Sequence, residues 1–143
     1  MPYRYLEDVT LADVAFEAWG ATREEMFIAA ADAAMNVMVE DLNTITAAQE
    51  KTIAKENESL EMLLFDFLGE LVFLKDAEKL ALRVSEIKLT EQNGRFSLTA
   101  RAYGEKINPA KHPLNVDVKA VTLHQFRVWQ SARGWHARVI LDV

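Results

Sequence analysis

The sequence predicts a single α+β domain over residues 1–143, with two helices packed on one face of a mostly antiparallel β-sheet. Three observations predict this class. Segments near both ends of the chain alternate between apolar and polar residues, as strands do. Two internal segments repeat apolar residues with the period of an α-helix, and Asn93-Gly94 is typical of a two-residue hairpin turn. No internal repeat or linker divides the chain.

The N-terminal part of the chain predicts two strands followed by a helix. Residues 3–6 are apolar and aromatic, and residues 13–19 alternate over a longer strand. Thr22 and Glu25 have the spacing of a capping box, in which two side chains accept hydrogen bonds from the free amides of a helix start. We expect this helix to end within residues 39–42. Its apolar stripe consists of Phe27, Ala30, Ala31, Ala34, Met35 and Met38.

A second helix follows a short strand predicted over residues 51–56. Asn57 or Ser59 is the expected N-cap, because both residue types accept hydrogen bonds from helix amides. The helix ends within residues 76–79. Its apolar face is broad, so we expect it to be the best buried helix; the face contains Leu60, Leu63, Leu64, Phe67, Leu68, Leu71 and Leu74.

The rest of the chain predicts strands. Residues 82–102 form a hairpin around Asn93-Gly94, with a bulge near Ser85-Glu86 where the alternation changes phase. Two prolines restrict a loop over residues 108–113. Beyond it, residues 118–129 predict another strand, which a turn connects to the last strand.

Composition excludes several classes of protein. Hydrophobic residues make up 50% and charged residues 27%, which excludes a disordered chain. A net charge of −6, with basic residues scattered along the chain, argues against stable binding of nucleic acid, because phosphate neutralisation dominates that affinity. The absence of Cys excludes thiolate zinc sites, disulfides and thiol nucleophiles. No standard nucleotide, hydrolase or metalloprotease motif is present.

The expected location is the cytoplasm. No apolar stretch reaches the roughly 20 residues that a membrane-spanning helix needs, so we expect no membrane partner. The N-terminus lacks the apolar core of a signal peptide.

The last predicted strand, residues 135–143, provides a candidate site. Asp142 lies on the more polar face of that strand, next to the terminal carboxylate of Val143. Asp13 lies on the less apolar face at the start of the first long strand. If these strands pair antiparallel, the start of one meets the end of the other and the three carboxylates converge.

Carboxylates that converge repel one another unless a proton or a cation lies between them. Oxygen ligands favour a hard ion such as Ca²⁺, Mg²⁺ or Mn²⁺. The alternative is that both aspartates face water at the strand ends.

Lys111, His112 and Lys119 form a second candidate group. A loop lysine and histidine are suited to bind phosphate or an acidic surface of a partner protein. The alternative is a solvated rim without a binding role.

The sequence resembles the archease family over nearly its whole length. The segments that carry the resemblance keep the family's order and spacing: Asp8-Val9-Thr10, Ala12-Asp13, Ala18-Trp19-Gly20, Leu63-Leu64-Phe65-Asp66-Phe67-Leu68, Glu70-Leu71, Lys111-His112-Pro113, Val118-Lys119-Ala120-Val121-Thr122 and Arg138-Val139-Ile140-Leu141-Asp142-Val143. Near the N-terminus the chain departs from the family. Val9 replaces the usual His, and Leu11 is an additional residue that changes the spacing between Asp8 and Asp13.

The resemblance implies an accessory protein rather than a catalyst. Archeases promote guanylylation of the active-site histidine of the RtcB-type RNA ligase and support its repeated turnover in tRNA splicing and RNA repair. The family's essential acidic residues match Asp13 and Asp142, with which a divalent ion is associated, and Val143 and Asp8 are further candidate ligands. Ca²⁺ is the expected ion, with Mg²⁺ or Mn²⁺ as alternatives. Lys111, His112 and Lys119 then become expected contacts with the ligase.

Two other classes of function stay open at this point. One is a metal-dependent phosphoesterase, although the sequence shows no general base that converges with the aspartates. The other is a chaperone-like interaction module in which the aspartates only organise the fold.

Overall fold

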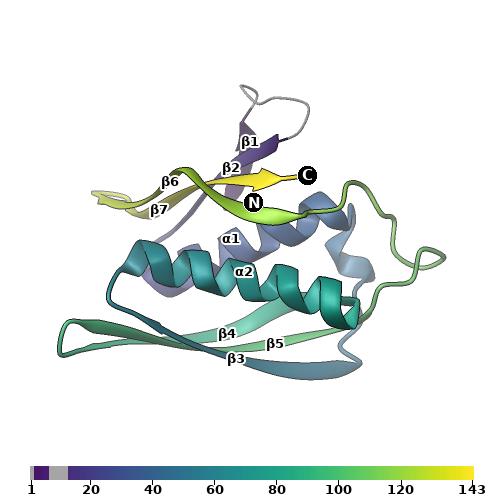
Figure 1. The fold of residues 1–143 in the computed structure, drawn as a ribbon, viewed down its shortest axis with the longest axis horizontal. Helices are drawn as coiled ribbons and strands as arrows, with labels where there is room; N and C mark the ends of the chain where they lie inside the picture. Colours follow the sequence, from purple (N-terminus) through teal and green to yellow (C-terminus); the bar gives the residue numbers. More distant parts are fainter. Residues whose placement is uncertain (1, 7–12) are drawn as a thin grey trace.

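The structure, a computed structural model, describes residues 2–6 and 13–143 and arranges them in three layers (Figure 1). A four-stranded sheet forms one outer layer and a three-stranded sheet the other, with two helices between them. In chain order the elements are β1 (Tyr3–Leu6), β2 (Asp13–Gly20), α1 (Arg23–Met38), the 3₁₀ turn η1 (Leu42–Thr44), β3 (Gln49–Asn57), α2 (Leu60–Glu78), β4 (Leu80–Gln92), β5 (Arg95–Lys106), β6 (Ala120–Ser131) and β7 (Gly134–Asp142).

The predicted α+β class, the two helices and the antiparallel pairing are confirmed. The expectation of one sheet is corrected, because the strands divide into the sheets β1-β2-β7-β6 and β3-β5-β4. The physical reason lies in α1. Besides its predicted stripe, the helix buries Met26, Ala29, Ala33 and Val37, so it is apolar on both sides and contacts strands of both sheets.

The helix starts follow the predicted capping residues. Thr22 Oγ1 accepts a hydrogen bond from the Glu25 amide at 3.1 Å, and Glu25 Oε2 accepts one from the Ala21 amide at 2.9 Å. Ser59 caps α2 by accepting from the Met62 amide at 3.2 Å. Helix α1 ends before the predicted range, because Val39 is already extended and pairs with the distant loop that precedes β6.

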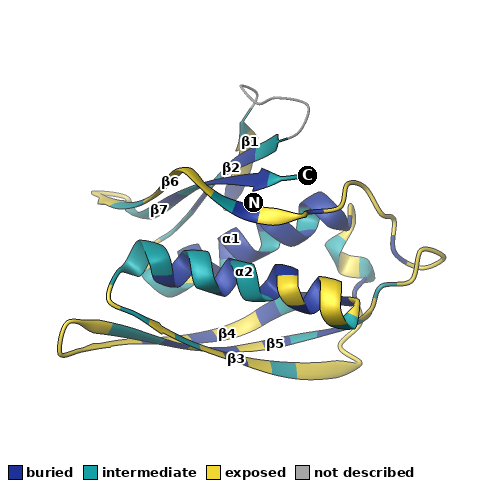
Figure 2. Cartoon of the chain, in the orientation of Figure 1, coloured by how far each residue is buried: buried dark blue, intermediate teal, exposed yellow. Residues whose placement is uncertain are grey.

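The core lies where the helices contact the two sheets, and burial is greatest there (Figure 2). Phe27 of α1 and Phe67 of α2 are fully buried, and their rings stack with centroids 5.9 Å apart. Every residue of the predicted α1 stripe is buried, and so is every residue of the predicted α2 face except the half-buried Leu60. Small alanines on α1 allow the sheets to approach that helix closely.

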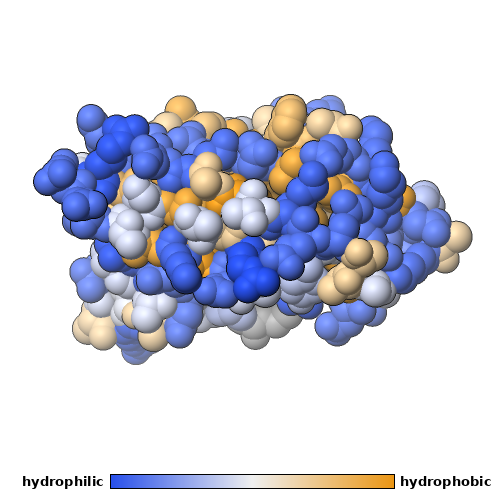
Figure 3. Space-filling model, turned by 90° about the horizontal axis from the view of Figure 1, so that it is seen from below, coloured by the Kyte–Doolittle hydropathy of each residue, from blue (hydrophilic) through white to orange (hydrophobic). Residues whose placement is uncertain are grey.

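The three-stranded sheet turns its other face outward, and that face is mostly hydrophilic (Figure 3). Exposed ion pairs cross it, such as Arg101 Nε to Glu50 Oε1 at 2.8 Å. The predicted bulge is present between Val84 and Glu86, and Asn93 and Gly94 both adopt the positive φ of a tight hairpin turn.

The four-stranded sheet joins strands from both ends of the sequence. Strand β2 pairs antiparallel with β7, and β7 pairs antiparallel with β6. The β6–β7 register shifts between Thr122 and Arg127, and within this bulge Gln125 has a φ of 53°. No helix in the described part of the chain is long and apolar enough to span a membrane.

Candidate functional site

Asp13 and Asp142 lie directly opposite each other where β2 begins and β7 ends. The antiparallel pairing that the sequence analysis assumed is therefore present. Directly opposed residues place their side chains on the same face of a sheet, with Cβ atoms roughly 4.5–5.5 Å apart.

The alternation of both strands fixes the face on which the two aspartates lie. Phe16 and Ala18 of β2 and Val139 and Leu141 of β7 point into the helix layer and are fully buried. Residues one position out of phase with them point to the outer face. Asp13 and Asp142 belong to this second set and are partly exposed, so solvent ions can reach them.

The carboxylate oxygens of Asp13 and Asp142 are the type of ligand that a hard divalent cation prefers. Two carboxylates, however, are fewer ligands than such an ion takes. Two opposed carboxylates repel each other, and a divalent ion between them removes that cost while using the oxygen ligands such ions prefer. Among residues 2–6 and 13–143, no group of three or more His, Asp or Glu side chains is placed to hold a metal. Of the other two candidate ligands, Val143 directly follows Asp142, and Asp8 lies outside the described residues.

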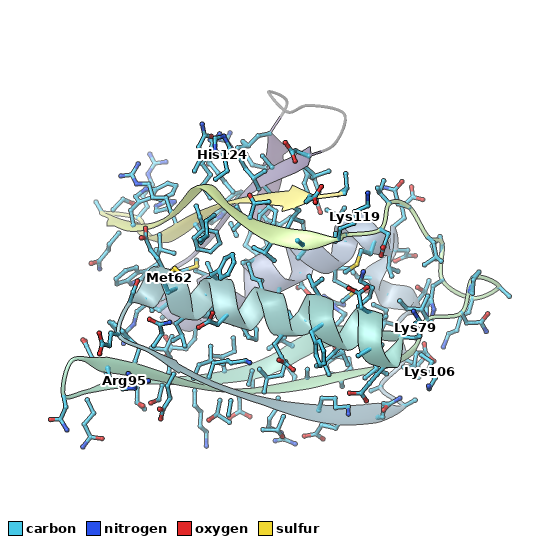
Figure 4. All side chains as sticks on the ribbon, viewed as in Figure 1. Met62, Lys79, Arg95, Lys106, Lys119 and His124 are labelled. Atoms are coloured by element: carbon cyan, nitrogen blue, oxygen red, sulfur yellow. The ribbon has the colours of Figure 1, made fainter. Side chains whose placement is uncertain are left out.

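Lys119 lies beside this pair of carboxylates. Its amide donates to the backbone carbonyl of Asp142 at 2.8 Å, and the next residue, Ala120, is the cross-strand partner of Asp142. Figure 4 shows the exposed Lys119 at the start of β6. The backbone of Lys119 thus adjoins the acidic end of the sheet, directly before β6 begins.

The loop that leads to Lys119 is anchored by a buried lysine of α2. Lys75 is only 4% exposed, and its Nζ donates to Asp117 Oδ1 and to the Val118 carbonyl, both at 2.7 Å. Burial acts to lower the pKa of Lys75, but its hydrogen bonds to Asp117 and Asp76 outweigh that effect and raise the pKa. Lys75 therefore stays charged and fixes the approach to β6.

Lys111 and His112 hold the other end of the same loop, around Glu105. Lys111 Nζ lies 2.6 Å from Glu105 Oε2, and His112 Nε2 lies 2.9 Å from the same oxygen. The Asn108 amide donates to His112 Nδ1 at 2.9 Å, so that nitrogen is an acceptor and the proton is on Nε2. The bonds from Lys111, the Thr46 amide and His112 lower the pKa of Glu105 to about 2.

This geometry corrects the expectation that His112 contacts a partner protein. The side chain is fully buried and both ring nitrogens are engaged, so it holds the loop instead. Lys111 is partly exposed and remains reachable, although it belongs to the same loop anchor. The three residues grouped by the sequence are thus divided, with Lys119 alone beside the acidic pair.

Sequence reasoning missed Lys75 and Glu105. Lys75 had a usable signal, because it follows Leu71 by one helical turn on the buried face of α2, where a cation needs a partner. Glu105 had none, since Thr46 is distant in the sequence and Lys111 and His112 reach Glu105 only through the fold of the loop after β5.

Comparison with known proteins gives a consistent result. A family model described as "Archease protein family (MTH1598/TM1083)" matches residues 3–143. A protein named archease from Methanosarcina barkeri is 37% identical over 142 residues, covering 99% of this chain and 95% of the relative. Another from Pyrococcus furiosus is 37% identical over 133 residues, covering 92% and 93%.

Solved structures share the fold. The solution structure of Methanobacterium thermoautotrophicum protein 1598 superposes with a TM-score of 0.86 at 35% identity, covering 99% of both chains. A crystal structure from Thermotoga maritima, described as an archease and possible chaperone, superposes with a TM-score of 0.61. At 20% identity over 96% of this chain and 97% of that one, the second likeness concerns the fold alone.

Proposed function

The chain belongs to the archease family, and on that premise we propose that it is a non-catalytic accessory protein of an RtcB-type RNA ligase. In this proposal it promotes guanylylation of the ligase's active-site histidine and so supports repeated turnover in tRNA splicing and RNA repair. The observation that carries the proposal is the direct opposition of Asp13 and Asp142, the pair that the resemblance marks as functional.

The two aspartates act as the binding edge. With Val143 as a further candidate ligand, they hold a divalent ion, Ca²⁺ in the first instance and Mg²⁺ or Mn²⁺ as alternatives. When bound, such an ion supplies positive charge, which is the main demand of nucleotidyl transfer. Rigid strands place the carboxylates, so the edge is presented without rearrangement.

Lys119 is the proposed contact beside this edge, because it is exposed and its backbone is fixed to β7. Lys111 is a second contact farther along the loop. His112 supports both through the loop anchor and is not itself a contact.

The test measures covalent guanylate incorporation into the purified ligase, with GTP, in the presence of Asp13→Asn or Asp142→Asn protein. Asn preserves shape and removes charge, so we expect at least about a tenfold loss of stimulation, the scale seen when metal-site interactions are removed. Glu91→Gln is the matched control, since Glu91 is exposed on β4, in the other sheet. It should stimulate like the unmodified protein.

A second readout does not depend on the ligase. Without metal, the Asp142→Asn variant should unfold at the same or a higher temperature than the unmodified protein, because it removes one charge of a like-charge pair. Added Ca²⁺ should raise the melting temperature of the unmodified protein only, since binding to the folded state stabilises it. Full stimulation by both folded variants, or an equal response to Ca²⁺, contradicts the proposed site.

A chaperone-like function is the second candidate, because apolar side chains are exposed around a hollow in the surface of this chain. In this chain Leu114 and Val116 are exposed and line a cavity of about 150 Å³ with Met38, a surface suited to apolar segments. Suppression of aggregation of an unrelated unfolded protein, without any effect on the ligase, would favour this function. Turnover of a simple phosphate ester by the protein alone would favour a phosphoesterase instead.

A further inference from the structure

A stack of aromatic and basic side chains covers the outer face of β6 and β7, toward the end opposite to the two aspartates. Trp129 and His136 are cross-strand partners, and their rings stack with centroids 5.2 Å apart and planes 9° from parallel. The Arg127 guanidinium lies 4.7 Å from the centre of the Trp129 ring. We call Arg127, Trp129 and His136 the stacking platform.

Arginines surround this platform from three strands and a turn. Arg4 is 67% exposed on β1, Arg138 lies on β7, and Arg133 lies in the exposed turn between β6 and β7. One acid, Glu17, lies between Arg4 and Arg138, with oxygens 3.2 Å and 4.0 Å from their guanidinium nitrogens. With Arg127, four arginines thus lie around Glu17 among the residues that the structure describes here, in a protein of net charge −6.

Two of these arginines repel each other when no anion is bound between them. Arg127 and Arg138 are direct cross-strand partners, and like charges at such positions repel. Gln125 accepts from Arg138 Nη2 at 3.0 Å while holding a left-handed backbone at the bulge. An anion bound between the arginines removes the repulsion.

A hollow lies beside the platform. It has a volume of about 380 Å³ and is lined by Arg4, Glu17, Trp19, Arg133 and His136. Indole and imidazole rings therefore stand next to guanidinium groups along one continuous surface. Any base has a flat face that stacks on such rings, and its phosphates bind arginine in bidentate geometry.

We infer that this face binds single-stranded nucleic acid, with bases on the stacking platform and in the adjoining hollow and phosphates on the four arginines. An acidic peptide would use the arginines but leave the stacked rings without a partner. A duplex hides its base faces, so the platform favours unpaired strands. The inference goes beyond the proposed function, because it uses neither the aspartate pair nor the ligase.

The net negative charge of the protein does not oppose this binding at ordinary salt. Many acids, Glu50, Glu56 and Glu86 among them, lie on the three-stranded sheet, beyond a helix layer that is itself about 10 Å thick. Charges farther apart than about 10 Å are largely screened at 0.1 M salt. The sequence expectation of no stable nucleic-acid binding rested on the scatter of basic residues, and the fold gathers residues 4, 127, 133 and 138 onto one face.

The test titrates the unmodified protein, without metal, into a fluorescent single-stranded oligouridylate of about 10 nucleotides, at salt concentrations from about 0.1 M upward, and follows anisotropy. Trp129→Ala should weaken binding about tenfold, and Trp129→Phe should restore most of it, because stacking needs only a ring. Arg127→Ala should weaken binding and reduce the salt slope by about 0.7. Arg101→Ala is the matched control, since it removes an equal charge from the other sheet.

Melting temperatures establish that each variant is folded. Binding that is unchanged in Trp129→Ala and Arg127→Ala overturns the inference, as does an equal loss in Arg101→Ala. Equally tight binding of a duplex of the same length also overturns the inference, because it shows simple attraction of anions. The same holds if inorganic polyphosphate displaces the oligonucleotide equally well from Trp129→Ala and from the unmodified protein. The inference is also overturned if the unmodified protein shows no detectable binding.

Discussion

Glu105 and Asp142 are both carboxylates at the ends of strands, yet the groups next to them differ: hydrogen-bond donors surround Glu105, and another carboxylate lies opposite Asp142. Glu105 receives hydrogen bonds from Lys111, His112 and a backbone amide, which favour its ionised form. Asp142 instead lies directly opposite a second carboxylate, that of Asp13. The first carboxylate therefore stabilises the folded protein as it is, whereas the second belongs to the pair that we propose as a cation site.

The loop anchor makes stability depend on acid pH. The pKa of Glu105 falls from its ordinary 4.5 to about 2, so the unfolded state binds more protons between these values. The anchor's contribution is thus present above pH 4.5 and is lost as the pH falls toward 2. We expect Glu105→Gln to lower the melting temperature at neutral pH and to flatten its decline in this window. Melting curves as a function of pH check this, with Glu91→Gln as the control; parallel profiles for all three proteins would contradict it.

At the residue scale the sequence predicted the acidic pair but not its surroundings. Asp13 and Asp142 were predictable because strand alternation and antiparallel pairing are local rules that carry through to three dimensions. His112 was assigned to a surface because a loop histidine beside proline has no sequence signature of burial. Its partner Glu105 lies on β5, and only the folded chain brings the two together.

At the scale of elements, α2 ends on a residue in an unfavourable conformation. Lys79 has φ 57° and ψ 36°, the left-handed region in which glycine is preferred at a helix end. Its carbonyl accepts from the Ile107 amide, so this conformation fixes the end of α2 against the end of β5, where Figure 4 shows Lys79 and Lys106 close together.

Lys79→Gly should therefore stabilise the protein by about 0.5–1 kcal/mol, because glycine adopts this backbone without strain. Lys79→Ala is the control, since it removes the same charge and keeps the strain. Denaturant unfolding should place the Gly variant above the unmodified protein and the Ala variant at or below it. Equal stability of the two variants would show that charge, not conformation, sets the effect.

Most elements were predictable because their signals are local. Thr22 and Ser59 cap the helices, and Asn93-Gly94 forms the hairpin. The end of α1 was not predictable, because it depends on a β-bridge between Val39 and Leu114, which lies far along the chain. The bulge in β6 also had no local signal, since the left-handed Gln125 depends on its bond to Arg138.

At the scale of the whole molecule, stability depends on the helix layer. Phe67→Ala removes a ring stacked on Phe27 between the sheets and should cost about 3–5 kcal/mol. Phe73 lies on the same helix but is 58% exposed, so Phe73→Ala should change stability by less than about 0.5 kcal/mol. Denaturant unfolding of both variants measures the difference. Similar losses would show that the layer is not the main core.

The division into two sheets was beyond the sequence, because alternation identifies the apolar face of a strand but not the layer that covers it. The alanines of α1 carried the signal, since a helix apolar on two sides needs a cover on both. If the alanines of α1 are interpreted as one apolar stripe, they predict only one sheet.

The pairing of β2 with β7 also determines the order in which the two sheets can form during synthesis of the chain. Strands β3, β4 and β5 are near neighbours in the sequence, so they have their partners soon after they emerge. Strand β2 emerges earlier but waits for β7, more than a hundred residues later, and pairings this distant form slowly. The carboxylate pair thus arises only when the nascent chain has folded from one end to the other, and a translation product truncated before β7 lacks the edge that we propose as the binding site.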